Sequence, residues 1–124
     1  MGRLGSLAVG FLVGGYARYF LAAGVTRGLG PAFPYGTLAV NLSGCLAIGF
    51  FDALAESRAL LGPEARLLLM TGFCGAYTTF SALILETSAL AGQGQTIRAL
   101  VNYVGSGVGG FILFRLGALL GRAG

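Results

Sequence analysis

Four long apolar stretches, joined by short polar loops, make up nearly the whole of this chain of 124 residues. They lie at about residues 4–25, 35–54, 65–91 and 97–120, and each matches the roughly 20 apolar residues that a helix needs to cross a bilayer. Only 10% of the residues are charged, whereas soluble domains carry about 25%. We therefore expect an all-α integral membrane protein with four transmembrane helices, forming a single domain over residues 1–124.

The few charged and reactive residues exclude several classes of function. The net charge of +4 comes from arginines near the ends of the apolar stretches, whereas nucleic-acid binding needs a clustered basic face. The chain has no histidine, and no nucleophile–base pair or metal-binding cluster can be found in it. Cys45 and Cys74 lie inside apolar stretches and are expected to be small buried hydrophobic residues. We expect neither an enzyme nor a nucleic-acid partner.

The arginines favour one orientation in the membrane only weakly. Four spans place both chain ends on the same side, and loops on the cytoplasmic side of a membrane protein usually carry the excess of arginine and lysine. The bias between the two sides is small: the terminal side has Arg3, Arg58, Arg66, Arg115 and Arg122, and the other side has Arg27 and Arg98, with Arg18 nearer that side.

Glycines spaced by four residues predict close contacts between helices. Small residues at this spacing allow two helix backbones to approach each other in a membrane. The pairs are Gly10 with Gly14, Gly105 with Gly109, and Gly117 with Gly121.

Polar side chains inside the apolar stretches are the first candidates for a functional site, because they are costly in a bilayer. Asn41 lies in the middle of the second stretch, where its amide could either bond helices together or line a pore. Glu86 is the only acid well inside a stretch. It could couple protons, form part of a polar relay, or reach the membrane interface from a position near the helix end.

A polar stripe is predicted along the fourth stretch. Asn102, Ser106 and Gly110 are spaced by four residues, which places them on one face of a helix. Such a stripe could pack helices together, or it could line a path if the third stretch supplies the opposite wall.

The third stretch is interrupted at residues 72–81, which read GFCGAYTTFS. A broken helix frees backbone carbonyls, and at membrane depth these must be satisfied by protein, water or an ion. We therefore expect a third helix broken mid-span, either as a kink healed by threonine hydroxyls or as a cation site built from carbonyls. Phe80 follows the break, and the positive edge of its ring could face an anion.

These features together resemble the Fluc (CrcB) fluoride channel family. Residues 14–19 are similar to the family's first-span signature around an arginine, here Arg18. Residues 36–44 match its GTLxVNxxG signature, and residues 72–81 closely match its GFCGGxTTFS signature. Glu86 falls where the family has a glutamate, and Asn102 with Ser106 matches its polar track.

The resemblance implies a fluoride-selective channel that exports cytoplasmic fluoride passively from a bacterial or archaeal plasma membrane. It implies an antiparallel, dual-topology homodimer with two pores. It also implies a structural sodium ion on the two-fold axis, held by the backbone carbonyls of Gly75 and Thr78, and a vestibule near Arg18. The expected anion path comprises Asn41, Thr79, Phe80, Ser81, Leu83, Glu86, Asn102 and Ser106.

Two residues depart from the family pattern. Leu83 stands where the family usually has a second phenylalanine, and Gly110 stands where a hydroxyl is common. Both departures concern the rate and route of conduction more than the family to which the chain is similar.

Two other functions fit a chain of this length. One is a proton-coupled exporter similar to the small multidrug resistance transporters, but those have a glutamate in the first span and a nearby tryptophan. This chain has Arg18 there and no tryptophan. The other is a membrane subunit that conducts nothing.

Overall fold

The structure, a computed structural model, describes residues 2–123, and these residues form helices and no strands. The first two helices are α1 (Arg3–Leu29) and α2 (Tyr35–Glu56). A third run combines α3 (Pro63–Arg66), the π-helix η1 (Leu67–Cys74), α4 (Gly75–Tyr77) and α5 (Phe80–Gly92), and the chain ends with α6 (Thr96–Ala123). Four helical runs, 3–29, 35–56, 63–92 and 96–123, are long and apolar enough to cross a membrane. The expected all-α class with four membrane-spanning helices is confirmed.

The helix ends follow from glycine and proline. Gly30 follows α1 with φ of 88°, a conformation that glycine adopts without steric cost. Pro63 occupies the first turn of α3, where its missing N–H would have no helical partner. The helices extend a few residues beyond the expected apolar stretches at most of their ends, because the polar residues that flank each stretch continue the helix.

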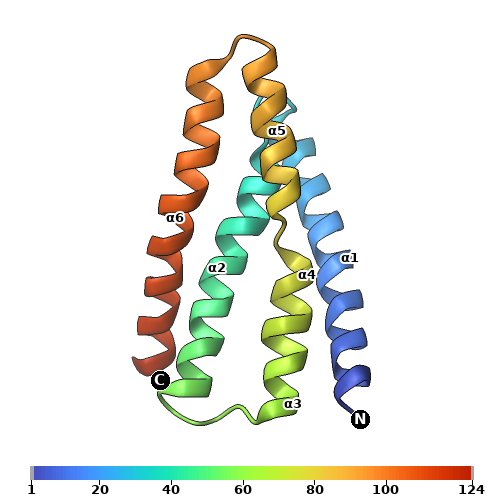
Figure 1. Ribbon diagram of the computed structural model, residues 1–124, viewed down its shortest axis with the longest axis vertical. Helices are drawn as coiled ribbons and strands as arrows, with labels where there is room; N and C mark the ends of the chain where they lie inside the picture. The colour runs from blue at the N-terminus through green and yellow to red at the C-terminus, as the bar shows by residue number, and fades with distance from the viewer. Residues whose placement is uncertain (1, 124) are drawn as a thin grey trace.

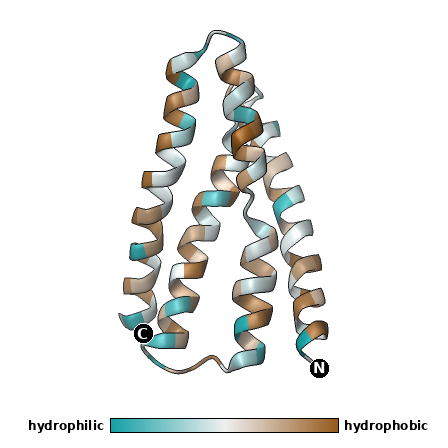
Figure 2. Cartoon of the chain, viewed as in Figure 1, coloured by the Kyte–Doolittle hydropathy of each residue, from teal (hydrophilic) through white to brown (hydrophobic). Residues whose placement is uncertain are grey.

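The four runs stand side by side, and both ends of the chain lie at the same end of the bundle (Figure 1). In the view of Figure 1, α6 and α1 are the outer helices, with α2 and the third run between them. Most hydrophilic residues gather toward the ends of the helices (Figure 2). Large apolar side chains such as Leu12, Val108 and Phe111 are exposed in the middle of the helices, as expected of surfaces that face lipid.

Two of the predicted glycine pairs bring helices into backbone contact. A methyl group added at Gly10 would lie 2.5 Å from the Leu68 carbonyl oxygen, and one at Gly14 would collide with the Phe73 carbonyl. Glycines of α6 contact α2 in the same way, with Gly117 against the Leu46 carbonyl. The expected packing of these pairs is confirmed.

The pair Gly105 with Gly109 is different. A methyl group at Gly105 would meet nothing within 4 Å, and one at Gly109 would meet only a methyl group of Leu42. Within residues 2–123 of one chain, this face of α6 meets no other backbone, so close packing of this pair stays a prediction.

The helical pattern of the third run stops at two residues. Thr78 (φ −93°, ψ 159°) and Thr79 (φ −149°, ψ 114°) are extended, and the helix resumes at Phe80. The two glycines of this stretch are helical: Gly72 lies within η1 against Gly10, and Gly75 begins α4. The non-helical segment is therefore shorter than residues 72–81 and is formed by the threonines.

Candidate functional site

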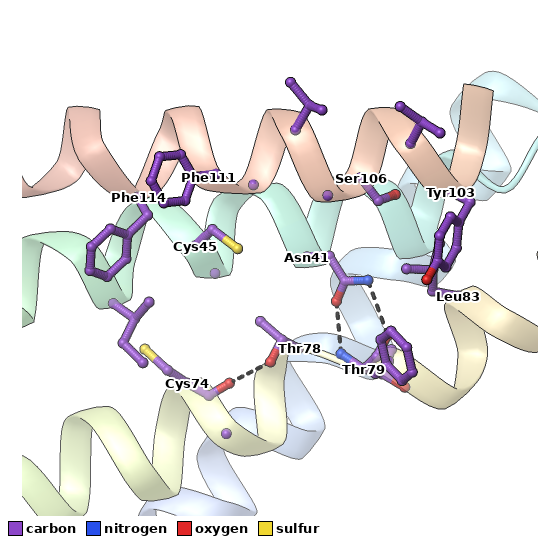
Figure 3. A pocket seen from close by; sticks show the side chains of 18 of the residues that line it. Asn41, Cys45, Cys74, Thr78, Thr79, Leu83, Tyr103, Ser106, Phe111 and Phe114 are labelled. Atoms are coloured by element: carbon purple, nitrogen blue, oxygen red, sulfur yellow. Dashed lines mark hydrogen bonds between the residues drawn. The ribbon is translucent and has the colours of Figure 1, made fainter. Parts of the chain in front are cut away.

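A cleft of ≈ 750 Å³ lies between α2, the third run and α6 (Figure 3). Among the residues expected at the anion path, the vestibule and the sodium site, seven line it: Asn41, Gly75, Thr78, Thr79, Phe80, Leu83 and Ser106. Residues more than 60 positions apart in the sequence therefore meet at one site. Four others do not line this cleft: Arg18, Ser81, Glu86 and Asn102.

Asn41 binds the extended segment with both ends of its amide. Its Nδ2 donates to the Thr79 carbonyl at 3.1 Å, and the Thr79 N–H donates to Asn41 Oδ1 at 2.7 Å (Figure 3). These two bonds replace backbone bonds that a continuous helix would make. Nδ2 carries a second hydrogen, and Asn41 also lines the cleft. Asn41 therefore bonds two helices together, and its place in the lining of a pore stays a prediction.

The threonine hydroxyls complete the ends of the two helices. Thr78 Oγ1 donates to the Cys74 carbonyl at 3.0 Å (Figure 3), and Thr79 Oγ1 accepts from the Ala82 N–H at 3.3 Å. Thr79 is therefore the N-cap of α5, the position where a threonine oxygen satisfies a free helical N–H.

These contacts deprive two carbonyls of their helical donors. The Thr79 N–H, which would reach the Gly75 carbonyl in a continuous helix, bonds to Asn41 instead. The Ala82 N–H, which would reach the Thr78 carbonyl, bonds to Thr79 Oγ1. The carbonyls of two residues that line the cleft, Gly75 and Thr78, thus lack those helical donors. Residues 2–123 contain no group of three or more His, Cys, Asp or Glu that could hold a metal.

The two candidate side chains of α5 differ sharply in exposure. Phe80 is 68% exposed at the start of α5, whereas Leu83 is only 7% exposed. Leu83 borders the cleft near Tyr103 (Figure 3). Tyr103 was not singled out from the sequence. Its position three residues before Ser106 places the two on one side of a helix, and this spacing could have identified it.

The polar stripe of α6 divides into a bonded part and an unbonded part. Asn102 is 1% exposed and donates from Nδ2 to Thr87 Oγ1 at 3.0 Å. Ser106 is 8% exposed, and its hydroxyl has no hydrogen-bond partner among the described residues. Gly110 instead receives the side chain of Cys45, whose Sγ would lie 3.1 Å from an added methyl group.

Glu86 lies within α5, six residues before its end, and is half-buried. One of its carboxylate oxygens, Oε1, is enclosed and has no hydrogen-bond partner among residues 2–123. A carboxylate oxygen of this kind is costly unless something satisfies it. Ser81 is exposed, one residue after the start of α5.

Arg18 lies on the other side of the third run, in a groove of ≈ 450 Å³ along α1 that is also lined by Tyr16, Tyr19 and Phe20. It is half-buried, and its Nε donates to the Ala76 carbonyl at 3.1 Å. Arg18 therefore contacts the segment next to the extended threonines, although it does not line the cleft.

Cys45 and Cys74 are free thiols on two walls of the cleft (Figure 3). Cys74 is buried, as the sequence predicted, and Cys45 is half-buried.

The fold and the cleft define a small multi-pass membrane protein in which polar groups meet beside a helix interruption. The chain belongs to the family described as CrcB-like protein, Camphor Resistance (CrcB), whose model matches residues 6–118. The resemblance that the motifs indicated is confirmed.

Relatives with the name fluoride-specific ion channel FluC match nearly the whole chain. The protein of Trichormus variabilis is 44% identical over 94% of this chain and 86% of its own length. The protein of a Synechococcus species is 43% identical over 94% of this chain and 90% of its own length. The protein of Chlorobium phaeobacteroides is 45% identical, with coverage of 94% and 90%. These relatives are ion channels by name, and they lend no support to a small multidrug resistance exporter.

Proposed function

We propose that this chain is a fluoride-selective ion channel that lets cytoplasmic fluoride leave the cell passively. The observation that carries the proposal is the meeting of two family motifs in one cleft, where Asn41 holds Thr79. The name shared by relatives that cover 94% of the chain supports the choice of fluoride. Passive conduction describes a channel and not an enzyme.

The groups that border the cleft suit a small anion that holds its water firmly. A pore for such an ion must replace the hydration shell with donors and still release the ion. Asn41 has a second Nδ2 hydrogen, and the Ser106 hydroxyl has no partner among the described residues. The Thr79 hydroxyl accepts a bond from Ala82 and keeps its own hydrogen to donate. Phe80, exposed beside them, can turn a positive ring edge toward an anion.

We propose that the anion path runs from Phe80, Asn41 and Leu83 past Thr79 and Ser81 to Ser106, and then toward Asn102 and Glu86. Support for the later part comes from the spacing of Ser106 and Asn102 and from the enclosed, unpartnered Oε1 of Glu86. Arg18 belongs to a vestibule that draws anions toward the path by its charge.

The working unit in this proposal is an antiparallel homodimer in a bacterial or archaeal plasma membrane. The cleft is flanked by apolar side chains that remain uncovered in one chain, such as Phe80, Phe111 and Val108. A second copy around a two-fold axis would cover them. Because the arginine bias between the two sides is small, insertion in both orientations is compatible with the positive-inside rule.

A structural sodium ion fits the carbonyl groups of the interruption. Gly75 and Thr78 would hold it with backbone oxygens, two from each chain and four about a two-fold axis. Hard oxygen donors suit a hard cation, and the absence of carboxylates from this donor set favours a monovalent ion. When bound, the ion supplies positive charge to carbonyls that hydrocarbon cannot satisfy.

The test is ion efflux from liposomes that contain the purified protein, with fluoride compared against chloride. We expect rapid fluoride efflux and chloride efflux at least about a hundredfold slower, and an imposed pH gradient should not accumulate fluoride against its own gradient. Comparable chloride efflux would contradict the selectivity, and accumulation driven by protons would favour the exporter. A C-terminal tag that is accessible from only one side of native membranes would contradict the dual topology.

A further inference from the structure

The interruption of the third run is held from two sides by two different helices. Asn41 of α2 bonds to both backbone groups of Thr79. From α1, Arg18 Nε donates to the carbonyl oxygen of Ala76 at 3.1 Å. The two contacts bracket the Thr78 carbonyl, one on the residue that follows it and one two residues before it. The Gly75 carbonyl immediately precedes the one that Arg18 binds.

The face of α1 that carries Arg18 is also the face in backbone contact with η1. Gly10, Gly14 and Arg18 are spaced by four residues, so they follow one another along the helix. A methyl group at Gly10 or Gly14 would collide with the backbone of Leu68, Gly72 or Phe73. Because these contacts leave little freedom in the register of α1 against η1, the next turn of α1 brings the guanidinium to Ala76.

The Arg18–Ala76 contact is the hydrogen bond that the structure gives this guanidinium, and no carboxylate lies within ion-pair distance of Arg18 in residues 2–123. A charged donor bonded to a carbonyl makes a stronger hydrogen bond than a neutral donor. At membrane depth an arginine is expensive, so its use to bind a backbone carbonyl at the interruption calls for a role there.

We propose that Arg18 is a positioning residue for the carbonyl cage. Its bond to the Ala76 carbonyl fixes the peptide planes between Gly75 and Thr78, and thereby the direction in which the carbonyls of those two residues point. This inference rests on the sodium site of the proposed function. It gives Arg18 a backbone-orienting role in addition to its charge in the vestibule.

A purely electrostatic role would have the opposite effect on a cation. A guanidinium close to the cage repels sodium, so loss of the charge alone would strengthen sodium binding. Loss of a positioning bond would instead weaken it, because the carbonyls must then be ordered when the ion binds. Whether loss of Arg18 strengthens or weakens sodium binding therefore distinguishes the electrostatic role from the positioning role.

The first experiment measures hydrogen exchange of the peptide covering residues 76–82 in the full-length protein, without sodium. We expect Arg18→Gln to raise exchange in this peptide by about tenfold or more. Arg18→Lys, which keeps a charged donor, should restore part of the protection. The matched control is Arg27→Gln, a change at an exposed arginine in the last turn of the same helix, which should leave the peptide unchanged. Equal exchange in wild type and both Arg18 variants would overturn the proposal.

The second experiment measures fluoride efflux while sodium replaces an organic cation. We expect Arg18→Gln to raise the half-saturating sodium concentration by about ten- to a hundredfold, the range for a hydrogen bond made by a charged group. Arg18→Lys should lie between Arg18→Gln and wild type. An unchanged or lower half-saturating concentration would overturn the positioning role.

The two readouts also separate this inference from the proposed function. If wild-type efflux does not depend on sodium, the sodium site is wrong, and the exchange experiment still decides whether Arg18 holds the interruption. If wild-type efflux depends on sodium but neither readout responds to Arg18→Gln, the positioning role alone is wrong.

Discussion

Helix α6 packs against two neighbours in opposite ways. Toward α2 it presents glycines, and Gly117 and Gly121 bring the two backbones together. Toward α5 it presents Asn102, which bonds to Thr87. The Ser106 hydroxyl and Glu86 Oε1 are enclosed without partners in the described residues. The α2–α6 interface is closely packed within a single chain, whereas only some of the polar groups of α5 and α6 have hydrogen-bond partners there.

This difference separates residues that stabilise the bundle from residues that we expect to take part in conduction. Close backbone packing stabilises helix pairs in a membrane, where apolar side chains gain little by leaving lipid. Unsatisfied polar groups cost stability at that depth, so they are retained for what they bind. The α2–α6 contact should therefore control folding, and the residues around α5 should control conduction.

The largest effect is expected at the glycine contact. Gly117→Leu would force a side chain into the Leu46 carbonyl and the Phe50 amide, so we expect destabilisation by about 3 kcal/mol or more. The matched control is Gly105→Leu on the same helix, where an added methyl group meets nothing within 4 Å. Thermal unfolding in detergent measures both. Equal destabilisation by the two variants would show that the glycine contact has no special weight.

The next effect is expected at the interruption. Asn41→Ala removes both bonds to Thr79. The N–H and carbonyl of Thr79 then lose these partners, at a cost of about 2–3 kcal/mol in folding stability. Asn41→Asp keeps the acceptor for the Thr79 N–H, but it places a carboxylate oxygen against the Thr79 carbonyl at membrane depth, so we expect a loss of stability at least as large. Fluoride efflux should fall in both variants. An Asn41→Ala protein with wild-type stability and efflux would show that these bonds are incidental.

The glycine contacts and the spans could be predicted from the sequence because they depend on local patterns. A run of apolar residues determines a span by its length, and glycines spaced by four must share a helix face. The Gly105 and Gly109 pair shows the limit of such patterns, because the same spacing occurs on a face that no backbone approaches within residues 2–123 of one chain.

The details of the site could not be predicted, because they depend on bonds between distant residues. Asn41 and Thr79 are 38 positions apart, and Arg18 and Ala76 are 58 apart. Their bonds determine which residues stay non-helical, and they shift the interruption from the glycines to Thr78 and Thr79. The π-helical form of η1 could not be predicted from the composition of the segment.

Phe80 provides a test in which conduction should change and folding should not. Because its ring is 68% exposed in one chain, Phe80→Leu should alter that chain's folding stability by less than about 0.5 kcal/mol. Loss of a ring edge that assists the anion should lower fluoride efflux by about tenfold. Leu83→Phe, which restores the aromatic residue usual in the family, should preserve or raise efflux. Full efflux in Phe80→Leu would identify the ring as a packing residue.

The smallest effect is expected where α5 and α6 are already bonded. Thr87→Val keeps the shape of the side chain and removes the oxygen that accepts from Asn102 Nδ2 at 3.0 Å. Hydrogen bonds between membrane helices contribute about 0.6 kcal/mol on average, so we expect a loss of that size and efflux within about twofold of wild type. The control is Ser88→Ala, at an exposed neighbouring position, which should change neither quantity. If Thr87→Val lowered the free energy of unfolding by more than about 2 kcal/mol, the α5–α6 interface would depend on this hydrogen bond about as strongly as the α2–α6 interface depends on its glycines. The contrast between the two interfaces would then be wrong.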